Sequence, residues 1–234
     1  MAEPRSERRA EVVLDAAEVR SPDGRVILHP ISLSLTEHRI GIIGPNGSGK
    51  STLARLVNGL VEASSGRVLV DGVDVARHGA AVRRRVGFCF TDPAAQVVMP
   101  TCVEDVELSL RKSIKDRVRR REAALRILER FGLGERADVS VHVLSGGQRQ
   151  LLALAGVLAT EPDLVIADEP TTLLDLRNTR LVAETLFGLD QQLILLTHDL
   201  DLVRRCDRVL LIEGGQVAFD GSAEAAVAQY EATV

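Results

Sequence analysis

Eight residues in the first quarter of the chain have the types and spacing of a phosphate-binding loop. They run Gly44-Pro-Asn-Gly-Ser-Gly-Lys-Ser51 and fit the pattern G-x-x-x-x-G-K-[ST]. Glycines let consecutive backbone N–H groups turn inward around phosphates, and the N-terminus of a following helix adds partial positive charge. Lys50 would reach the terminal phosphates, and the hydroxyl of Ser51 would ligate Mg²⁺. The predicted nucleotide-binding residues are Gly44, Pro45, Asn46, Gly47, Ser48, Gly49, Lys50, Ser51 and Thr52.

Two neighbouring carboxylates, Asp168 and Glu169, follow the apolar run Leu164-Val-Ile-Ala167. Pro162 and Pro170 lie on either side of this run and delimit a short buried strand. Asp168 at the strand end suits the ligand shell of Mg²⁺. Glu169 would point elsewhere, which suits a general base that polarises the attacking water. The alternative is a pair of ordinary surface carboxylates, and the phosphate loop in the same chain argues against it.

The phosphate loop lies between a predicted strand and a predicted helix. The strand is Arg39 to Gly44, and apolar residues after the loop recur at the i, i+3, i+4, i+7 spacing of a helix. Beyond Leu144, apolar helices alternate with short strands, which predicts a parallel sheet with helices on both faces. Residues 11–35 have short β-branched runs around the turn Ser21-Pro-Asp-Gly24 and predict an antiparallel opening sheet.

The other expected elements follow from the same periodicities. A strongly basic stretch from about Thr101 to Phe131 looks helical. Short strands are expected at Arg67 to Val70, Arg85 to Phe90, Leu164 to Ala167, Leu193 to Thr197, Arg208 to Ile212 and Gln216 to Phe219, and helices up to Ala159, at Leu176 to Phe187 and after Ser222.

The segment Leu144-Ser-Gly-Gly-Gln148 begins a predicted helix. Ser145 and Gln148 stand at the S-x-x-Q spacing of a capping box, ahead of an apolar helical face. An ordinary helix cap is the simplest interpretation. Two adjacent glycines, Gly146 and Gly147, are nevertheless unfavourable in a first helical turn, by up to ~1 kcal/mol each relative to Ala. We therefore expect another group to approach this backbone closely.

Five segments, in this order, resemble the nucleotide-binding subunits of ABC transporters. They are the phosphate loop, Leu144 to Gln148, Asp168-Glu-Pro-Thr171, Leu174-Asp175 and Thr197-His-Asp199. In that family two subunits enclose two ATP molecules, and each γ-phosphate lies between the phosphate loop of one subunit and the signature segment of the other. The resemblance thus implies that the signature residues contact the ATP of a partner subunit. Those residues are Leu144, Ser145, Gly146, Gly147 and Gln148.

The same resemblance assigns two further residues. It implies that Asp175 communicates across the dimer. It also implies that His198 contacts the γ-phosphate and the attacking water, which makes it a catalytic residue beside Glu169. A single histidine after a strand is otherwise most simply a helix cap.

Adenine recognition departs from the usual pattern of the family. Its members usually have an aromatic residue upstream of the phosphate loop that stacks on adenine. No Phe, Tyr or Trp precedes Phe88 in this chain, and Ser21 occupies the expected position. Adenine could instead rest on Val26 or on Arg20, because a guanidinium can stack on a ring. We expect base recognition to be loose enough to tolerate GTP.

A second departure follows the strand that ends at Phe90. The family normally has Phe-Gln here, with that Gln facing Mg²⁺ and linking to the membrane subunit, whereas this chain has Thr91. A Thr oxygen can still face Mg²⁺ or its water, but it reaches less far. The later Gln96, together with the residues up to Thr101 and with Glu104-Asp-Val106, resembles the energy-coupling-factor importers of vitamins and metal ions. Within that group, Thr91-Asp-Pro93 and Thr36-Glu-His-Arg-Ile40 resemble the ATPases of biotin uptake.

The composition is that of a soluble globular protein of 234 residues, 45% hydrophobic and 26% charged, with a formal net charge of −4. This charge argues against nucleic-acid binding across the whole surface. The longest apolar stretch, Leu151 to Ala159, is well short of the ~20 residues that span a bilayer as a helix, so a membrane role requires a partner. Residues 1–9 lack an apolar signal core, which indicates the cytoplasm. Cys89, Cys102 and Cys206 have no ligand-like spacing and are expected to be free thiols.

The resemblance implies one ABC-type ATPase domain over residues 1–234. It predicts an α/β P-loop NTPase core at roughly 1–91 and 158–234, with an antiparallel β part, and a helical lobe at roughly 92–157. The implied activity is ATP- and Mg²⁺-dependent, as the motor subunit of an energy-coupling-factor importer, with biotin as the expected solute.

The implied partners are an integral membrane coupling protein, a substrate-binding membrane protein and a second ATPase subunit, in a homodimer or a heterodimer. The chain would lie peripherally at the cytoplasmic face of the cell membrane, without a nucleic-acid partner. Residues 91–130 would form the docking face, with basic side chains near the membrane surface.

Three alternatives remain open. The first is the ATPase subunit of another vitamin or metal-ion importer. The second is an export-type or amino-acid-import motor, against which the segment Phe90 to Thr101 argues. The third is a soluble ABC-type ATPase acting on DNA or the ribosome, which the absence of a coiled-coil insertion and of a second phosphate loop disfavours.

Overall fold

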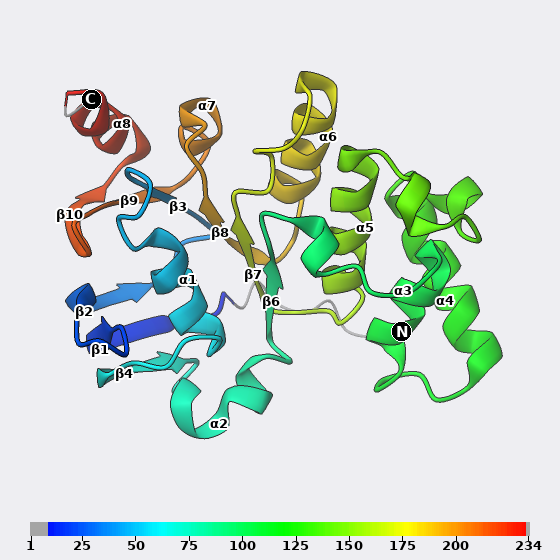
Figure 1. The fold of residues 1–234 in the computed structure, drawn as a ribbon, viewed down its shortest axis with the longest axis horizontal. Coiled ribbons are helices and arrows are strands. Elements are labelled where there is room, and N and C mark those ends of the chain that lie inside the picture. Colours follow the sequence, from blue (N-terminus) through cyan, green and yellow to red (C-terminus); the bar gives the residue numbers. More distant parts are fainter. Residues whose placement is uncertain (1–8, 233–234) are drawn as a thin grey trace.

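The computed structural model of this chain describes residues 9–232, so nearly all of the N-terminal stretch expected to lack a signal core lies outside the described residues. Two β-sheets and a group of helices make up the fold (Figure 1). The strands are β1 (Val12–Arg20), β2 (Val26–Leu35), β3 (Arg39–Ile43), β4 (Ser65–Val70), β5 (Val73–Asp74), β6 (Val86–Cys89), β7 (Leu164–Asp168), β8 (Gln192–Leu196), β9 (Arg208–Glu213) and β10 (Gln216–Gly221).

The helices lie between these strands in the chain, except for the last one, which follows β10. They are α1 (Lys50–Asn58), α2 (Val75–Val82), α3 (Cys102–Leu110), α4 (Arg117–Arg130), α5 (Gly146–Leu158), α6 (Leu176–Phe187), α7 (Leu200–Val203) and α8 (Ala223–Glu231), with short 3₁₀ turns η1 (Pro93–Ala95), η2 (Gly134–Arg136) and η3 (Val141–Val143).

The antiparallel sheet expected at the N-terminus is present, with the strand order β2-β1-β4-β5. Val12 pairs with Leu35 of β2 on one side and with Val70 of β4 on the other. All three side chains are buried in one core. The register shifts after Leu14, where Ala16 adopts a positive φ of 47°, as at a β-bulge.

The second sheet has the order β10-β9-β3-β8-β7-β6, and its five strands from β9 to β6 are parallel. Every residue of β3, β7 and β8 is buried, which is typical of strands covered on both faces. Alternate side chains enter different cores. Ile166 and Ile194 share a core with α1 and the antiparallel sheet, whereas Val165 and Leu193 pack with α5 and α6. The α/β class predicted from the sequence is confirmed.

The basic stretch from about Thr101 to Phe131 is helical except for residues 111–116, which separate α3 from α4. Asp116 caps α4 by accepting a hydrogen bond from the backbone N–H of Arg119. The Arg120 guanidinium donates to the carbonyls of Ile114 and Lys115 and holds the intervening turn against α4. Arg120 is therefore a structural residue within a run that looks uniformly solvent-facing in the sequence.

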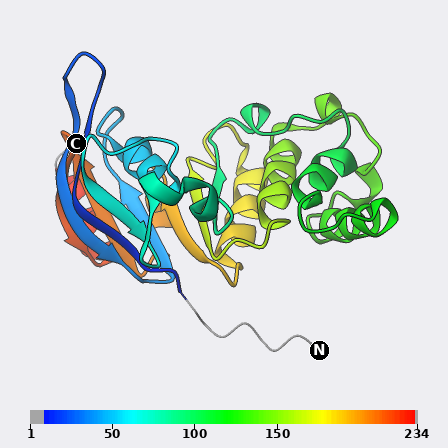
Figure 2. The same cartoon turned by 90° about the horizontal axis from the view of Figure 1, so that it is seen from below.

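The helices of residues 102–158 gather at one end of the molecule, and the two sheets lie at the other (Figure 2). Helix α2 was missed by the sequence analysis. It contains Gly79, and His78 has non-helical angles, so its pattern is interrupted. Cys89, Cys102 and Cys206 are buried free thiols, as expected. None of the helices within residues 9–232 is long and apolar enough to cross a membrane.

Candidate nucleotide site

The phosphate loop connects β3 to α1 and depends on two glycines. Gly44 and Gly49 have positive φ angles of 140° and 106°. A Cβ at Gly44 would lie 2.0 Å from the carbonyl oxygen of Ile212, and one at Gly49 would lie 2.6 Å from a methyl carbon of Leu28. Only glycine fits at these positions. The loop can therefore turn tightly ahead of the N-terminus of α1, where phosphate binding is favoured.

Lys50 lies folded into the loop. Its Nζ donates to the carbonyl oxygens of Gly44, at 2.7 Å, and Pro45, at 3.0 Å. Burial lowers the pKa of Lys50, and the negative charges of Glu169 and Asp168 oppose that shift. Ser48 places a buried hydroxyl nearby that has no hydrogen-bond partner among residues 9–232. The loop thus holds a cation and an unsatisfied hydroxyl, both of which phosphate oxygens can bind.

Ser51 and Asp168 meet although they are far apart in the sequence. The Ser51 hydroxyl donates to Asp168 Oδ1 at 3.0 Å. Asp168 is 2% exposed, and burial raises its pKa, against the hydrogen bond from Ser51 and the charge of Arg55. Arg55 lies 4.0 Å from Asp168 Oδ2 and was not singled out in the sequence.

The oxygen atoms at this point fit Mg²⁺. The ion is usually bound in proteins by one or two carboxylates, waters and substrate phosphates, and a hydroxyl and a carboxylate lie together here. No group of three or more His, Cys, Asp or Glu side chains that could hold a metal occurs in the described part of the chain. Any Mg²⁺ here would take its remaining ligands from waters and from phosphates of the nucleotide.

Glu169 and His198 also lie in contact. His198 Nδ1 is 2.8 Å from Glu169 Oε2, and the Thr172 hydroxyl donates to the same oxygen at 3.0 Å. Glu169 has a positive φ of 51°, which is uncommon for a residue other than glycine. The Glu169 side chain contacts Thr172 and His198, whereas that of Asp168 contacts Ser51. Thr172 was missed because only the folded chain shows its contact.

Thr91 and Gln96 have different local partners. The Thr91 hydroxyl donates to the backbone carbonyl of Asp168 at 2.9 Å, next to the Ser51 contact. The Gln96 amide donates to the carbonyl of Phe88 and accepts from the N–H of Phe90, each at 3.2 Å. Gln96 therefore fixes the end of β6, and the Thr91 side chain that follows is held against β7.

The predicted capping box at the start of α5 is present. The Ser145 hydroxyl accepts from the N–H of Gln148, and the Gln148 side chain accepts from the N–H of Ser145. The two glycines differ in their surroundings. A Cβ at Gly147 would lie 2.3 Å from Cγ of Asn178, whereas a Cβ at Gly146 would make only ordinary contacts at 3.7 Å.

The close approach expected at this segment is thus partly internal. Asn178 of α6 supplies it at Gly147, and no group in the described residues supplies it at the exposed Gly146. Asp175, four residues after Thr171, is the N-cap of α6 and accepts from the N–H of Asn178 at 2.8 Å. Its side chain is on the exposed surface. Within residues 9–232, the signature segment, which runs from Leu144 to Gln148, makes no hydrogen bond to the phosphate loop.

The candidate adenine contacts lie at the turn between β1 and β2. Arg20 donates to Glu18 at 2.6 Å and to the carbonyl of Gly24 at 3.4 Å, so its guanidinium is already engaged. The Ser21 hydroxyl contacts Asp23. Val26 is partly exposed. Because its side chain is apolar, it makes no hydrogen bond that would compete with adenine.

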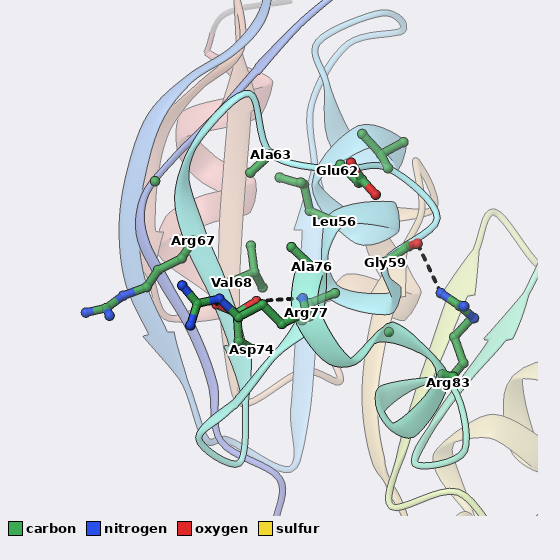
Figure 3. A pocket seen from close by; sticks show the side chains of 15 residues that line it. Leu56, Gly59, Glu62, Ala63, Arg67, Val68, Asp74, Ala76, Arg77 and Arg83 are labelled. Atoms are coloured by element: carbon green, nitrogen blue, oxygen red, sulfur yellow. Dashed lines mark hydrogen bonds and ion pairs between the residues drawn. The ribbon is translucent and has the colours of Figure 1, made fainter.

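A separate cavity of about 520 Å³ lies between α1, α2 and β4 (Figure 3). Leu56, Ala63 and Val68 form part of its wall, and Arg83 donates to the carbonyl of Gly59 at its edge. Asp74 is the N-cap of α2, and its side chain accepts a hydrogen bond from the backbone N–H of Arg77, three residues later. Residues 44–52 do not line this cavity. It is therefore not the phosphate site.

A glycine-rich loop between a parallel strand and a helix, with an aspartate hydrogen-bonded to its serine, defines a P-loop nucleoside triphosphatase. The family described as ABC transporter matches residues 28–172. The chain therefore belongs to the ABC transporter family as an ATP-binding, ATP-hydrolysing domain, and the fold and enzyme class predicted from the sequence are both confirmed.

Individual relatives agree with this assignment. The chain is 43% identical over 206 residues to the biotin transport ATP-binding protein BioM of Rhizobium etli, covering 88% of this chain and 92% of that protein. CbiO1 of Clostridium perfringens, described as part of the ABC transporter complex cbiONQ, aligns with a TM-score of 0.83 and 30% identity over 96% of this chain and 93% of that one. The ATP-binding cassette MJ0796, in a dimeric post-hydrolysis state with ADP and Pi, aligns with a TM-score of 0.80 and 27% identity, covering 91% and 98%.

Proposed function

We propose that the chain is the ATPase subunit of an energy-coupling-factor importer and that it works as a dimer beneath integral membrane partners. The observation that carries the ATPase part is the convergence of Lys50, Ser51 and Asp168 at the end of the parallel sheet. The names of the relatives support transport. The chain would then lie at the cytoplasmic face of the membrane.

The phosphate loop would bind the nucleotide through its backbone and Lys50. The bonds that now hold Lys50 Nζ to Gly44 and Pro45 would be exchanged for bonds to phosphate oxygens. Ser51 and Asp168 would hold Mg²⁺ together with those oxygens, and the ion supplies charge neutralisation to the phosphates when bound. Thr91 would stay next to this site through its bond to the Asp168 backbone.

Glu169 would act as the general base. A carboxylate that takes a proton from the attacking water must lie within hydrogen-bond reach of it. His198 and Thr172 both contact Oε2 of Glu169, and its other carboxylate oxygen has no hydrogen-bond partner within residues 9–232. His198 would contact the γ-phosphate from this position.

A second subunit would complete the site through Ser145, Gly146 and their neighbours from Leu144 to Gln148. Gly146 is exposed and nothing within residues 9–232 explains its lack of a side chain, which supports an approach by a group from outside the chain. Asp175 would face the same interface. The dimeric state of the similar MJ0796 cassette is consistent with this arrangement.

Biotin is the proposed solute because the Thr91 to Pro93 and Thr36 to Ile40 segments and a 43% identical relative named for biotin transport favour it. Another vitamin or a metal ion is the second candidate, because the chain is also similar to CbiO1, which is described as part of the ABC transporter complex cbiONQ and not as a biotin transporter. We also propose the division into a core of roughly 1–91 and 158–234 and a helical lobe of roughly 92–157. Residues 91–130 would carry the docking face for a membrane coupling protein, which in turn serves a substrate-binding membrane protein.

Copurification tests this proposal. The tagged chain is isolated from native membranes in mild detergent, and its partners are identified by mass spectrometry. Integral membrane subunits should accompany it, and uptake of labelled biotin into cells should fall when Lys50→Ala replaces the native chain. If the partners are present and biotin uptake is unchanged while that of another vitamin or metal ion falls, biotin is wrong and the importer assignment stands. If no integral membrane protein accompanies the chain, the importer assignment is wrong.

A further inference from the structure

An open, shallow bay of about 590 Å³ lies between the 111–116 turn and α4. Figure 1 shows α4 at the helical end of the molecule. Its lining residues are Ser113, Ile114, Lys115, Asp116, Arg119, Glu122 and Arg126. None of these residues has a role in the nucleotide site. The bay therefore needs an explanation of its own.

The bay is built into the most basic part of the chain. Residues 111–130 contain nine Lys or Arg and three Asp or Glu, although the whole protein has a formal net charge of −4. Two of the nine cations are occupied inside the structure. Arg120 is bound to two carbonyls, and Arg121 pairs with Asp138 at 2.6 Å. The positive charge that faces solvent is thus concentrated on the remaining residues.

Three of these cations line the bay without an acidic partner. Lys115, Arg119 and Arg126 are exposed, and none makes an ion pair within residues 9–232. Lys115 has only a 3.4 Å bond to the carbonyl of Arg111. Arg119 and Arg126 are seven residues apart on α4 and share one face of it. Asp116 and Glu122 also line the bay, so three cations face two carboxylates there and its formal net charge is +1.

An exposed apolar side chain accompanies the cations. Val118, between Arg117 and Arg119, is 67% exposed. Cationic side chains with an adjacent exposed apolar residue suit the interface of an anionic bilayer, where charged tips meet headgroups and apolar atoms meet the acyl boundary. Single-stranded RNA is usually held by aromatic stacking as well as by charge, and residues 111–130 contain no aromatic residue. The chemistry therefore favours lipid over RNA.

The bay belongs to residues 91–130, which carry the proposed docking face, and it lies beside a second groove of that segment. A groove of about 260 Å³ is lined by Gln96 and Ser109, and the turn that forms the bay leaves α3 immediately after Ser109 and Leu110. The Ser113 hydroxyl bonds back to the carbonyl of Leu110, which keeps the turn close to that end of α3. A membrane partner on the docking face would thus bring the bay toward the bilayer.

We propose that this bay binds anionic phospholipid headgroups through Lys115, Arg119 and Arg126, so that the ATPase contacts the membrane directly. The inference rests on the proposed function, because a peripheral subunit of an importer lies beside the bilayer. Each basic residue near an anionic surface contributes about 1 kcal/mol, so loss of two corresponds to a ~30-fold weaker binding.

Vesicle cosedimentation of the full chain tests the proposal without any membrane partner. Vesicles contain phosphatidylglycerol mixed with phosphatidylcholine, or phosphatidylcholine alone. Arg119→Glu with Arg126→Glu is compared with Arg77→Glu with Arg84→Glu, which changes the net charge equally but lies on and after α2, away from the bay. Thermal unfolding and ATP affinity verify that both variants are folded.

We expect the native chain to bind anionic but not neutral vesicles, and to be released when ionic strength rises from about 0.1 M to about 1 M. The bay variant should bind at least ~30-fold more weakly, and the α2 variant should stay within ~3-fold of the native chain. No binding of the native chain, or an equal loss in both variants, overturns the proposal. So does loss of RNA-oligonucleotide binding in the bay variant without any effect on vesicle binding. Because the importer assignment is tested by copurification, each of these results leaves that assignment standing.

Discussion

The two glycines at the start of α5 should respond in opposite ways to alanine. Neither has a positive φ, so both backbones accept alanine. At Gly146 the new Cβ meets only atoms at 3.7 Å, and at Gly147 it would lie 2.3, 2.4 and 2.6 Å from Cγ, Oδ1 and Cβ of Asn178. A rotamer change can move Cγ and Oδ1, but Cβ is fixed by the backbone of α6. The helices must therefore move apart in Gly147→Ala.

The expected magnitudes follow from this geometry. Gly146→Ala should stabilise the fold by about 0.4–1 kcal/mol, because alanine restricts the unfolded chain. Gly147→Ala should destabilise it by about 1–3 kcal/mol through overpacking. For a domain of this size a change of 1 kcal/mol shifts Tm by roughly 2–4 °C. The two variants should thus lie on opposite sides of the native Tm.

Thermal unfolding of four further variants checks the cause: Asn178→Gly and Asn178→Ala, each alone and each combined with Gly147→Ala. The free energy of unfolding of the double variant with Asn178→Gly should lie within about 0.5 kcal/mol of that of Asn178→Gly alone, because this change removes the Cβ of residue 178. Asn178→Ala should restore much less, because its Cβ remains. If Asn178→Ala rescues as well as Asn178→Gly, or if Gly147→Ala is as stable as Gly146→Ala, the contact with α6 is not the reason for glycine at this position.

The Gly146→Ala variant also tests the shared site, because its stability and its turnover should change in opposite directions. If a partner's ATP approaches Gly146, Gly146→Ala should be more stable than the native chain and still lose turnover, by ~10²-fold for a displacement of about 1 Å at the reacting group. A stable Gly146→Ala variant with native turnover would contradict the approach of a second subunit.

Other changes test the remaining roles. Glu169→Gln should keep ATP binding and slow phosphate release by ~10²–10⁴-fold, while Lys50→Ala loses binding; near-native turnover of Glu169→Gln would remove Glu169 from the role of base. Competition binding should show a preference for ATP over GTP below ~10²-fold, or about 2.7 kcal/mol, since no upstream aromatic stacks on the base; a stronger preference means that another group reads adenine. If the native protein is a homodimer, mixing Lys50→Ala chains with Ser145→Arg chains should recover activity, because in a mixed dimer one of the two sites is free of both changes. No recovery in a mixture that does form mixed dimers refutes the shared site. Burial raises the pKa of Cys89 and Cys206 to about 12, so both should stay unreactive to a thiol reagent near pH 8 until the chain unfolds, and labelling of the native protein at either would show an opening of the core.

The residues that carry chemistry were readable from the sequence because their patterns are local. The phosphate loop and the Ser145 capping box each lie within eight consecutive residues. The helix expected at Leu176 to Phe187 coincides with α6, and the structure shows that Asp175 is its N-cap. The break between α3 and α4 was missed because Asp116 is its one capping signal within a run of helix-forming Arg residues.

Contacts between distant segments could not be read in this way. Thr172 on Glu169 and Asn178 against Gly147 follow from how strands and helices pack, and a single sequence has no signal for that pairing. Gly146 and Gly147 illustrate this limit of a single sequence. The sequence correctly indicates a close approach but does not tell whether it comes from the same chain or from another molecule.

The sheet order explains why four separate segments form one site. The phosphate loop, Thr91 and His198 follow β3, β6 and β8, and Asp168 is the last residue of β7. The carboxyl ends of neighbouring parallel strands lie along one edge. The register then sets their depth, with Ala167 opposite Cys89 on one side and Leu195 on the other.

A slip of one residue in β7 would exchange its two faces. Leu164 and Ile166 would then face α5 and α6, and the smaller Val165 and Ala167 would face α1, with voids on one side and overlap on the other. Core packing of this kind costs about 1–3 kcal/mol for each misfitting side chain. Because Asp168 is the last residue of β7, the same packing that fills the two cores also fixes its carboxylate beside Ser51, so the precision of the site comes from the apolar residues that precede it.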